Sequence, residues 1–155
     1  MNGSRKLETL FPNLNSGNYL VTSRHDSSYN CVAWAFGEVD SWWWPDSSGQ
    51  YYWPEEVEKS ETIEAFVAVC RRSDYELCDN SKFESGFEKI AIYADGDQRP
   101  THLSRQLPNG SWTSKIGKLE DIQHTLEGLE GLNSLYGMVT RILKRRRISI
   151  RNDAT

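Results

Sequence analysis

The chain is organised around one stretch, Tyr29-Asn30-Cys31-Val32-Ala33-Trp34-Ala35-Phe36-Gly37, which joins a polar loop to a short apolar helix. Asn30 is a typical N-cap residue, so a helix is predicted to begin at Cys31 and to stop at Gly37. A sulfur in the first helical turn lies near the positive end of the helix dipole, which favours the thiolate. Cys31 is therefore the candidate nucleophile. The alternative is that Cys31 is a small buried core residue.

Composition indicates one globular domain over residues 1–155, because 37% of the residues are hydrophobic and 26% are charged. The sequence has neither a long apolar run nor a secretory signal, so we expect no membrane association and a cytoplasmic location, or export without a signal peptide. The three cysteines are too irregularly spaced for a disulfide framework or a zinc site. We therefore expect no metal and no cofactor. The net charge of -4 argues against a nucleic-acid partner.

The two ends of the chain carry little chemistry. Residues 1–24 are predicted to form an irregular arm with a short edge strand at 19–21. Residues 144–155 are predicted to form a basic tail that begins with Lys144-Arg145-Arg146-Arg147. Between the ends, apolar residues at three-and-four spacing from Glu61 predict an amphipathic helix that buries Cys70.

Strand patterns dominate the second half of the chain. Alternating residues predict strands at 88–94, 101–107, 111–116 and 138–143, and residues 119–124 are predicted to begin a short helix. The order of elements predicts an α+β domain with helices packed on one side of an antiparallel sheet.

An aromatic loop follows the Cys31 helix and holds four of the six tryptophans of the chain. Clustered aromatic rings can stack on a sugar or a peptide, or can cover a neighbouring site. The alternative is that the rings attach the loop to the core. The candidate substrate-binding residues are Trp42, Trp43, Trp44, Tyr52 and Trp53.

The Asn109-Gly110 pair predicts a hairpin between strands 101–107 and 111–116. A two-residue loop would pair Leu107 with Trp112, which would place His102 on the same sheet face as Thr113 and Lys115.

A cysteine at a helix start and a histidine on the first strand of a hairpin form an arrangement that thiol hydrolases use. The chain resembles the papain-like superfamily in its NlpC/P60 and CHAP branch, through Asn30-Cys31, Thr101-His102 and the following segment Gly110 to Gly117. It is also similar to small bacterial proteins that share an Asn-Cys-x-Ala-Trp-Ala start, a Trp-Trp-Pro loop and a Trp-Thr-Ser-Lys-x-Gly strand.

The resemblance implies a papain-like α+β fold and a cysteine hydrolase or acyltransferase acting on an amide bond. The substrate would be a peptide, a peptidoglycan stem or an isopeptide. Cys31 would attack the carbonyl carbon after His102 takes its proton. The oxyanion would be stabilised by the Cys31 N–H together with Asn30 or Tyr29.

The family pattern adds a third polar residue that fixes the histidine tautomer. Here that catalytic role falls to Ser114 or Asp121, with Thr113 or a backbone carbonyl as alternatives. The rival interpretation is a non-catalytic module that binds a partner protein in a bacterial toxin, immunity or phage-defence system.

Overall fold

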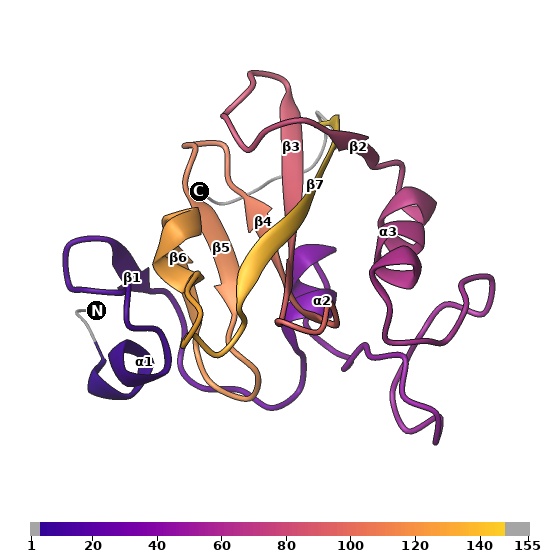
Figure 1. Cartoon of the computed structure of the whole chain (residues 1–155), viewed down its shortest axis with the longest axis horizontal. Coiled ribbons are helices and arrows are strands. Elements are labelled where there is room, and N and C mark those ends of the chain that lie inside the picture. The colour runs from indigo at the N-terminus through magenta and orange to yellow at the C-terminus, as the bar shows by residue number, and fades with distance from the viewer. Residues whose placement is uncertain (1–3, 148–155) are drawn as a thin grey trace.

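The computed structural model describes residues 4–147, which are built on one seven-stranded sheet (Figure 1). The strands lie in the order β1-β6-β5-β4-β3-β7-β2, and each pairing between them is antiparallel. Their bounds are β1 Tyr19–Val21, β2 Glu76–Cys78, β3 Phe87–Ala94, β4 Pro100–Gln106, β5 Trp112–Lys115, β6 Asp121–His124 and β7 Met138–Arg146.

Helices are few and short: α1 (Arg5–Leu10), α2 (Cys31–Ala35), α3 (Ile63–Arg72) and the 3-10 helix η1 (Leu126–Leu129). The expected papain-like or NlpC/P60-like α+β fold, with helices packed on one side of the sheet, is therefore wrong, because the fold is β-rich and the sheet dominates it. None of the helices in the described residues is long and apolar enough to cross a membrane.

Several elements were predicted correctly. The N-cap at Asn30, the helix start at Cys31 and the helix that buries Cys70 are confirmed. The short edge strand in the N-terminal arm is also confirmed, as β1. The helix expected at 119–124 is wrong, because this segment forms β6 and pairs with both β1 and β5. Helix α1 was missed, since Leu7 is its one buried residue and gives no periodic signal.

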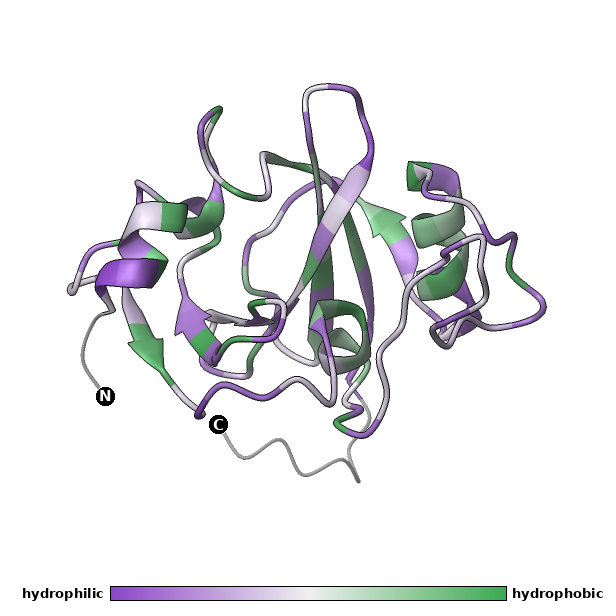
Figure 2. Ribbon diagram, turned by 90° about the horizontal axis from the view of Figure 1, so that it is seen from below, coloured by the Kyte–Doolittle hydropathy of each residue, from purple (hydrophilic) through white to green (hydrophobic). Residues whose placement is uncertain are grey.

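The side chains of β3 alternate between two hydrophobic cores. Ile90 and Ile92 pack with residues of α2 and α3, and we call this side of the sheet the α2 face. Ala91 and Tyr93 pack with Leu7 of α1, and we call this side the α1 face. Much of α2 and α3 is hydrophobic, as the green segments of Figure 2 show. Both faces of the sheet are therefore covered.

The hairpin between β4 and β5 has a register that differs from the expected one by one residue. The Leu107 N–H donates to Ser111 O at 2.7 Å, and Gln106 pairs with Trp112. The loop is therefore the three residues 108–110, with Gly110 at a φ of 91° as such loops require. The pairing of Leu107 with Trp112 is wrong, and the one-residue difference exchanges the faces of β5 relative to β4.

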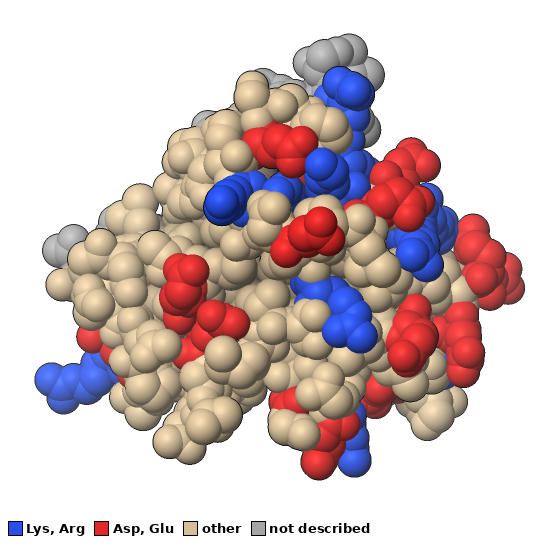
Figure 3. Space-filling view, turned by 45° about the horizontal axis from the view of Figure 1, so that its top comes forward, with Lys and Arg blue, Asp and Glu red and all other residues tan. Residues whose placement is uncertain are grey.

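The basic run at 144–147 is not a free tail. Residues 144–146 belong to β7, and the remaining tail from 148 lies outside the described residues. Lys144 contacts Glu84 at 3.0 Å, and Arg145 contacts the buried Glu88 at 2.9 Å. Arg147 also contacts Glu88, at 3.4 Å. Figure 3 accordingly shows basic and acidic side chains interleaved rather than one uniform basic patch.

Candidate functional site

Asn30 holds the start of α2 against the aromatic loop. Its Oδ1 accepts hydrogen bonds from the N–H of Ala33 at 3.3 Å and of Trp43 at 3.0 Å. Its Nδ2 donates to Trp43 O at 2.7 Å. The Oδ1 and one of the two Nδ2 N–H groups are thus used in the fold, and these bonds fix the side chain that was expected to stabilise an oxyanion.

Cys31 begins α2 as predicted, but its thiol is not activated. The residue is 5% exposed, and burial raises the pKa of the Cys31 thiol to about 11. The Leu103 N–H and the Lys115 ammonium favour the thiolate and lower the pKa, but burial outweighs them. At neutral pH the sulfur is therefore a thiol, so the helix-dipole argument alone did not predict its state.

The sheet separates Cys31 from His102. Leu103 packs in the same core as Cys31, whereas His102 pairs with Tyr93, a residue of the α1 face. The His102 ring contacts Tyr93 edge-on at 5.3 Å and stacks on Tyr136 at 4.0 Å with an interplanar angle of 7°. His102 Nδ1 has no hydrogen-bond partner in the described part of the chain. The expected Cys31–His102 dyad is therefore not formed.

Ser114 does lie beside His102, at the centre of a buried hydrogen-bond network. His124 Nδ1–H donates a hydrogen bond to Thr125 O at 2.6 Å, because a carbonyl oxygen can only accept. In the neutral ring the other nitrogen, Nε2, therefore accepts a hydrogen bond from the Ser114 hydroxyl at 2.7 Å. Ser114 Oγ then accepts from His102 Nε2–H at 2.8 Å and from the Ser104 hydroxyl at 2.7 Å. These bonds fix both histidine tautomers.

Burial keeps both imidazoles neutral. Burial and the neighbouring His124 hold the pKa of His102 well below its usual value, and burial lowers the pKa of His124 to about 4. A neutral His102 supplies no positive charge to favour a thiolate. The expected partnership of His102 and Ser114 is present as geometry, but it lies on the face away from the Cys31 helix.

Asp121 and Tyr29, the other two candidates, lie on the α2 face. The Tyr29 hydroxyl donates to Asp121 Oδ2 at 2.8 Å. The Lys115 ammonium donates to Gly117 O at 2.6 Å and lies 4.8 Å from the centroid of the Tyr29 ring. Burial, then Asp121, raises the pKa of Tyr29. Asp121 thus accepts the hydrogen bond of the Tyr29 hydroxyl on the α2 face, and it does not orient His102.

An open pocket of about 290 Å³ lies beside Cys31. It is lined by Asn30, Cys31, Trp42, Trp44, Tyr51, Thr101, Gly117 and Tyr136. Two of the candidate substrate-binding residues, Trp42 and Trp44, line this aromatic pocket.

The remaining three candidates of the aromatic loop do not line the pocket. Trp43 and Trp53 are buried in the core of the α2 face, and Tyr52 packs against Trp43 at 4.7 Å while it remains half exposed. These rings attach the loop to the core, as the alternative interpretation stated. Sequence reasoning missed Tyr51, Thr101 and Tyr136, although Thr101 follows from strand alternation with Leu103.

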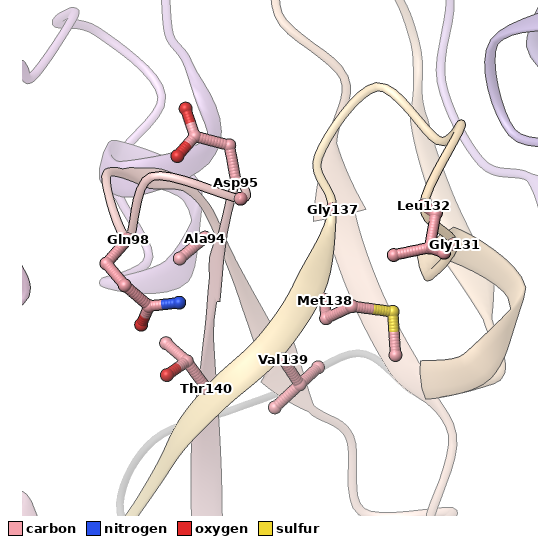
Figure 4. A pocket seen from close by; sticks show the side chains of 10 residues that line it. Ala94, Asp95, Gln98, Gly131, Leu132, Gly137, Met138, Val139 and Thr140 are labelled. Atoms are coloured by element: carbon pink, nitrogen blue, oxygen red, sulfur yellow. The ribbon is translucent and has the colours of Figure 1, made fainter.

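A second hollow, of about 250 Å³, opens between the β3–β4 turn and the segment before β7 (Figure 4). Leu132 and Met138 line one side, and Gln98 and Thr140 line the other. Leu132 is 95% exposed. Gly137 permits the close approach of the two segments, because a Cβ there would lie 2.1 Å from Ala94 O. Among the described residues that line this hollow, Asp95 is the one ionisable group, so we treat the hollow as a surface notch.

The chain was compared with protein families, curated proteins and solved structures. No curated protein and no solved structure matches it. A family model described as "Domain of unknown function (DUF7689)" matches residues 20–144, a span that contains α2, α3 and all of the strands except the ends of β1 and β7. The chain therefore belongs to the DUF7689 family.

Proposed function

We propose that this chain is a non-catalytic binding domain whose aromatic pocket takes up an apolar or aromatic side chain of a partner peptide. The observation that carries the proposal is the separation of Cys31 from His102 by the sheet. A cysteine nucleophile needs a base within hydrogen-bond reach, and His102 Nδ1 has no such contact within the described residues.

The chemistry of the pocket favours an apolar ligand. None of the lining residues within the described part of the chain is charged, and four of them are aromatic. The polar groups are mostly engaged: Asn30 bonds to Trp43, and the Thr101 hydroxyl donates to Tyr136 O at 2.6 Å. Ring faces stack well on flat or aliphatic groups, and such contacts contribute roughly 0.5–1.5 kcal/mol beyond area burial.

Amide hydrolysis or acyl transfer stays a prediction, as does the papain-like relationship. So do a toxin, immunity or phage-defence setting and a cytoplasmic location. For catalysis, the Cys31 thiol would need a lower pKa than its buried position gives it. A binding domain needs no such activation.

The test uses N-acetyl-phenylalaninamide, which offers both an aromatic side chain and a cleavable amide. Proton–nitrogen correlation spectra should show saturable shifts of the Trp42 and Trp44 indole signals. Trp42→Ala should weaken binding about tenfold through the lost stacking contact. Cys31→Ser should bind the probe with an affinity within about twofold of that of the parent protein, since the proposal gives the sulfur no covalent role.

Two results would contradict the proposal. One is the absence of a saturable shift at these indole signals. The other is ammonia release from the probe that depends on Cys31, which would favour the hydrolase instead. Trp112→Phe is the matched control, because Trp112 lies on the α1 face, away from the pocket.

A further inference from the structure

The aromatic pocket beside Cys31 is walled by rings from two parts of the chain. Trp42, Trp44 and Tyr51 line it from the aromatic loop, and Tyr136 lines it from the segment before β7. The Trp42 and Tyr51 rings lie next to each other, with centroids 6.0 Å apart and an interplanar angle of 38°. The volume of about 290 Å³ is at the lower end of the range of ligand pockets, roughly 300–1,000 Å³, so a compact group fits it best.

Two of these rings are held in place by other rings of the fold. The Trp44 ring meets the buried Phe66 ring edge-on at 5.3 Å. The Tyr136 ring stacks on His102 at 4.0 Å, and its backbone oxygen accepts from the Thr101 hydroxyl at 2.6 Å. Binding therefore does not have to order these side chains, which lowers its entropic cost.

The segment that carries three of the rings is strongly acidic. Residues 38–61 contain one lysine and seven acidic residues, which gives the segment a formal net charge of -6. The acids are Glu38, Asp40, Asp46, Glu55, Glu56, Glu58 and Glu61. Asp46 lies between Trp44 and Tyr51 in the chain, and a hydrogen bond from the Ser48 hydroxyl holds the pKa of Asp46 below its usual value. The negative potential of this segment attracts cations towards the pocket.

A basic residue, Lys115, approaches the pocket from β5. Its ammonium donates to the backbone oxygen of Gly117, which lines the pocket, while Lys115 itself is buried. The carboxylates of Asp26 and Asp121 interact with this ammonium and favour its charged form. The positive charge of Lys115 is therefore compensated within the fold.

We propose that the aromatic pocket binds a quaternary ammonium group, the trimethylated lysine side chain of a partner peptide. This inference rests on the proposed function and names the side chain that the pocket takes up. Aromatic faces attract cations, and tryptophan is the most effective ring. A trimethylammonium group has an apolar surface and no N–H, so it needs no acceptor. An unmodified lysine ammonium is strongly hydrated, and the described lining offers no carboxylate to replace that water.

The probe is N-acetyl-trimethyllysine methylamide, compared with two close analogues. One is a neutral isostere with a tert-butyl group in place of the trimethylammonium, and the other is N-acetyl-lysine methylamide. The Trp42 and Trp44 indole signals in proton–nitrogen spectra report binding. The affinity for the trimethyllysine probe should exceed that for the neutral isostere at least about fivefold, because only the charge differs. It should exceed that for unmodified lysine by a similar factor, about fivefold or more.

Phosphocholine tests the source of the group. It presents the same trimethylammonium head beside a phosphate, which the acidic segment 38–61 repels. Phosphocholine should therefore bind at least about threefold more weakly than the trimethyllysine probe. Tighter binding of phosphocholine would overturn the peptide as the source.

Variants separate the attraction of the rings from apolar packing. Trp42→Leu removes a ring but keeps an apolar side chain, and should abolish most of the preference for trimethyllysine over its neutral isostere. Tyr52→Leu changes a half-exposed ring of the same loop that is not among the residues of the described pocket lining, and should leave the preference unchanged. If Trp42→Leu fails to fold, the comparison of the two ligands on the parent protein still decides.

Equal affinities for the trimethyllysine probe and its neutral isostere would overturn the proposal. Saturable binding of N-acetyl-phenylalaninamide in the same experiment would show that the proposed function stands without it. If neither N-acetyl-phenylalaninamide nor any of the lysine probes shifted the indole signals, the proposed function and this inference would both be contradicted.

Discussion

The two faces of the sheet bury polar groups in opposite ways. On the α2 face, Cys31 is a neutral thiol near the ammonium of Lys115, which donates to Gly117 O. On the α1 face, His102 and His124 are neutral bases joined through one serine hydroxyl. Burial thus raises the pKa of the Cys31 thiol on the α2 face and lowers the pKa of the two histidines on the α1 face.

One residue of loop length decides which residues of β5 share a sheet face with His102. With a two-residue loop, the hairpin would place His102 on the same face of the sheet as Thr113 and Lys115. The observed three-residue loop pairs Gln106 with Trp112 and places His102 with Ser114 instead. The pairing of His102 with Tyr93 of β3 places it on the α1 face, away from the core that holds Cys31. The comparison of the two faces is therefore the point to test.

The largest effect is expected from the centre of the histidine network. Ser114→Ala leaves three buried partners of the hydroxyl unpaired and should destabilise the fold by about 4 kcal/mol. Thr113→Ala is the matched control on the opposite face, where one bond from the Trp34 indole is lost, and should cost about 1 kcal/mol. Urea unfolding at pH 7 measures both. Equal losses would contradict the network.

The next largest effect is expected from acid, which should destabilise the fold through the buried histidines of the α1 face. The pKa of His124 is about 4 when folded, below its usual value, so the unfolded chain binds more protons at pH 4 to 6.5. Stability is therefore full above about pH 6.5 and falls toward pH 4, by about 3 kcal/mol for His124 alone. His102 acts in the same direction.

Unfolding in urea at pH 7, 6, 5 and 4 measures this loss. His124→Gln cannot titrate, so its stability should depend less steeply on pH even if the variant is less stable at pH 7. A parent protein with constant stability between pH 6.5 and 4 would show that the buried imidazoles are not held neutral.

Alkali should act on the α2 face. The pKa of Cys31 is raised to about 11 in the folded chain, above its usual value near 9. Its contribution to stability is present below about pH 9 and is lost as the pH rises through 11, by at most about 3 kcal/mol. Cys31→Ala should flatten the stability profile between pH 9 and 11. If the stability of Cys31→Ala fell with pH as steeply as that of the parent protein, the raised pKa of the Cys31 thiol would be contradicted.

A smaller effect is expected at the link between α2 and the aromatic loop. Asn30→Ala removes the N-cap and both bonds to Trp43, and should cost about 2 kcal/mol. Asn30→Asp keeps the accepted bonds and should cost less. If Asn30→Ala also weakens N-acetyl-phenylalaninamide binding, the cap positions the pocket. Unfolding midpoints with equal values for both variants would rule out this role.

Local signals in the sequence predicted local structure well. The cap residue Asn30, the helical spacing from Ile63 and the alternation before Ala94 each specify their element within one short window. These signals depend on neighbours in the chain, so they hold before tertiary contacts are known.

The sheet faces could not be predicted in the same way. Pro108-Asn109-Gly110 is compatible with two loop lengths, and the choice depends on burying Trp112 on the α1 face. Burial also decided the state of Cys31, because desolvation outweighs the helix terminus. Tyr136 lies in a loop distant in sequence, and the hydrogen bond from the Thr101 hydroxyl to Tyr136 O holds this loop beside the pocket. No local sequence pattern predicts such a contact.

The most direct test of the separation of Cys31 from His102 is the rate of Cys31 alkylation by iodoacetamide as a function of pH. Mass spectrometry of labelled peptides follows Cys31 against the partly exposed Cys78, and circular dichroism checks folding. The separation predicts slow labelling with no inflection below pH 9 and a superimposable profile for His102→Gln. An inflection at or below pH 7 in the parent protein, displaced upward in His102→Gln, would contradict it.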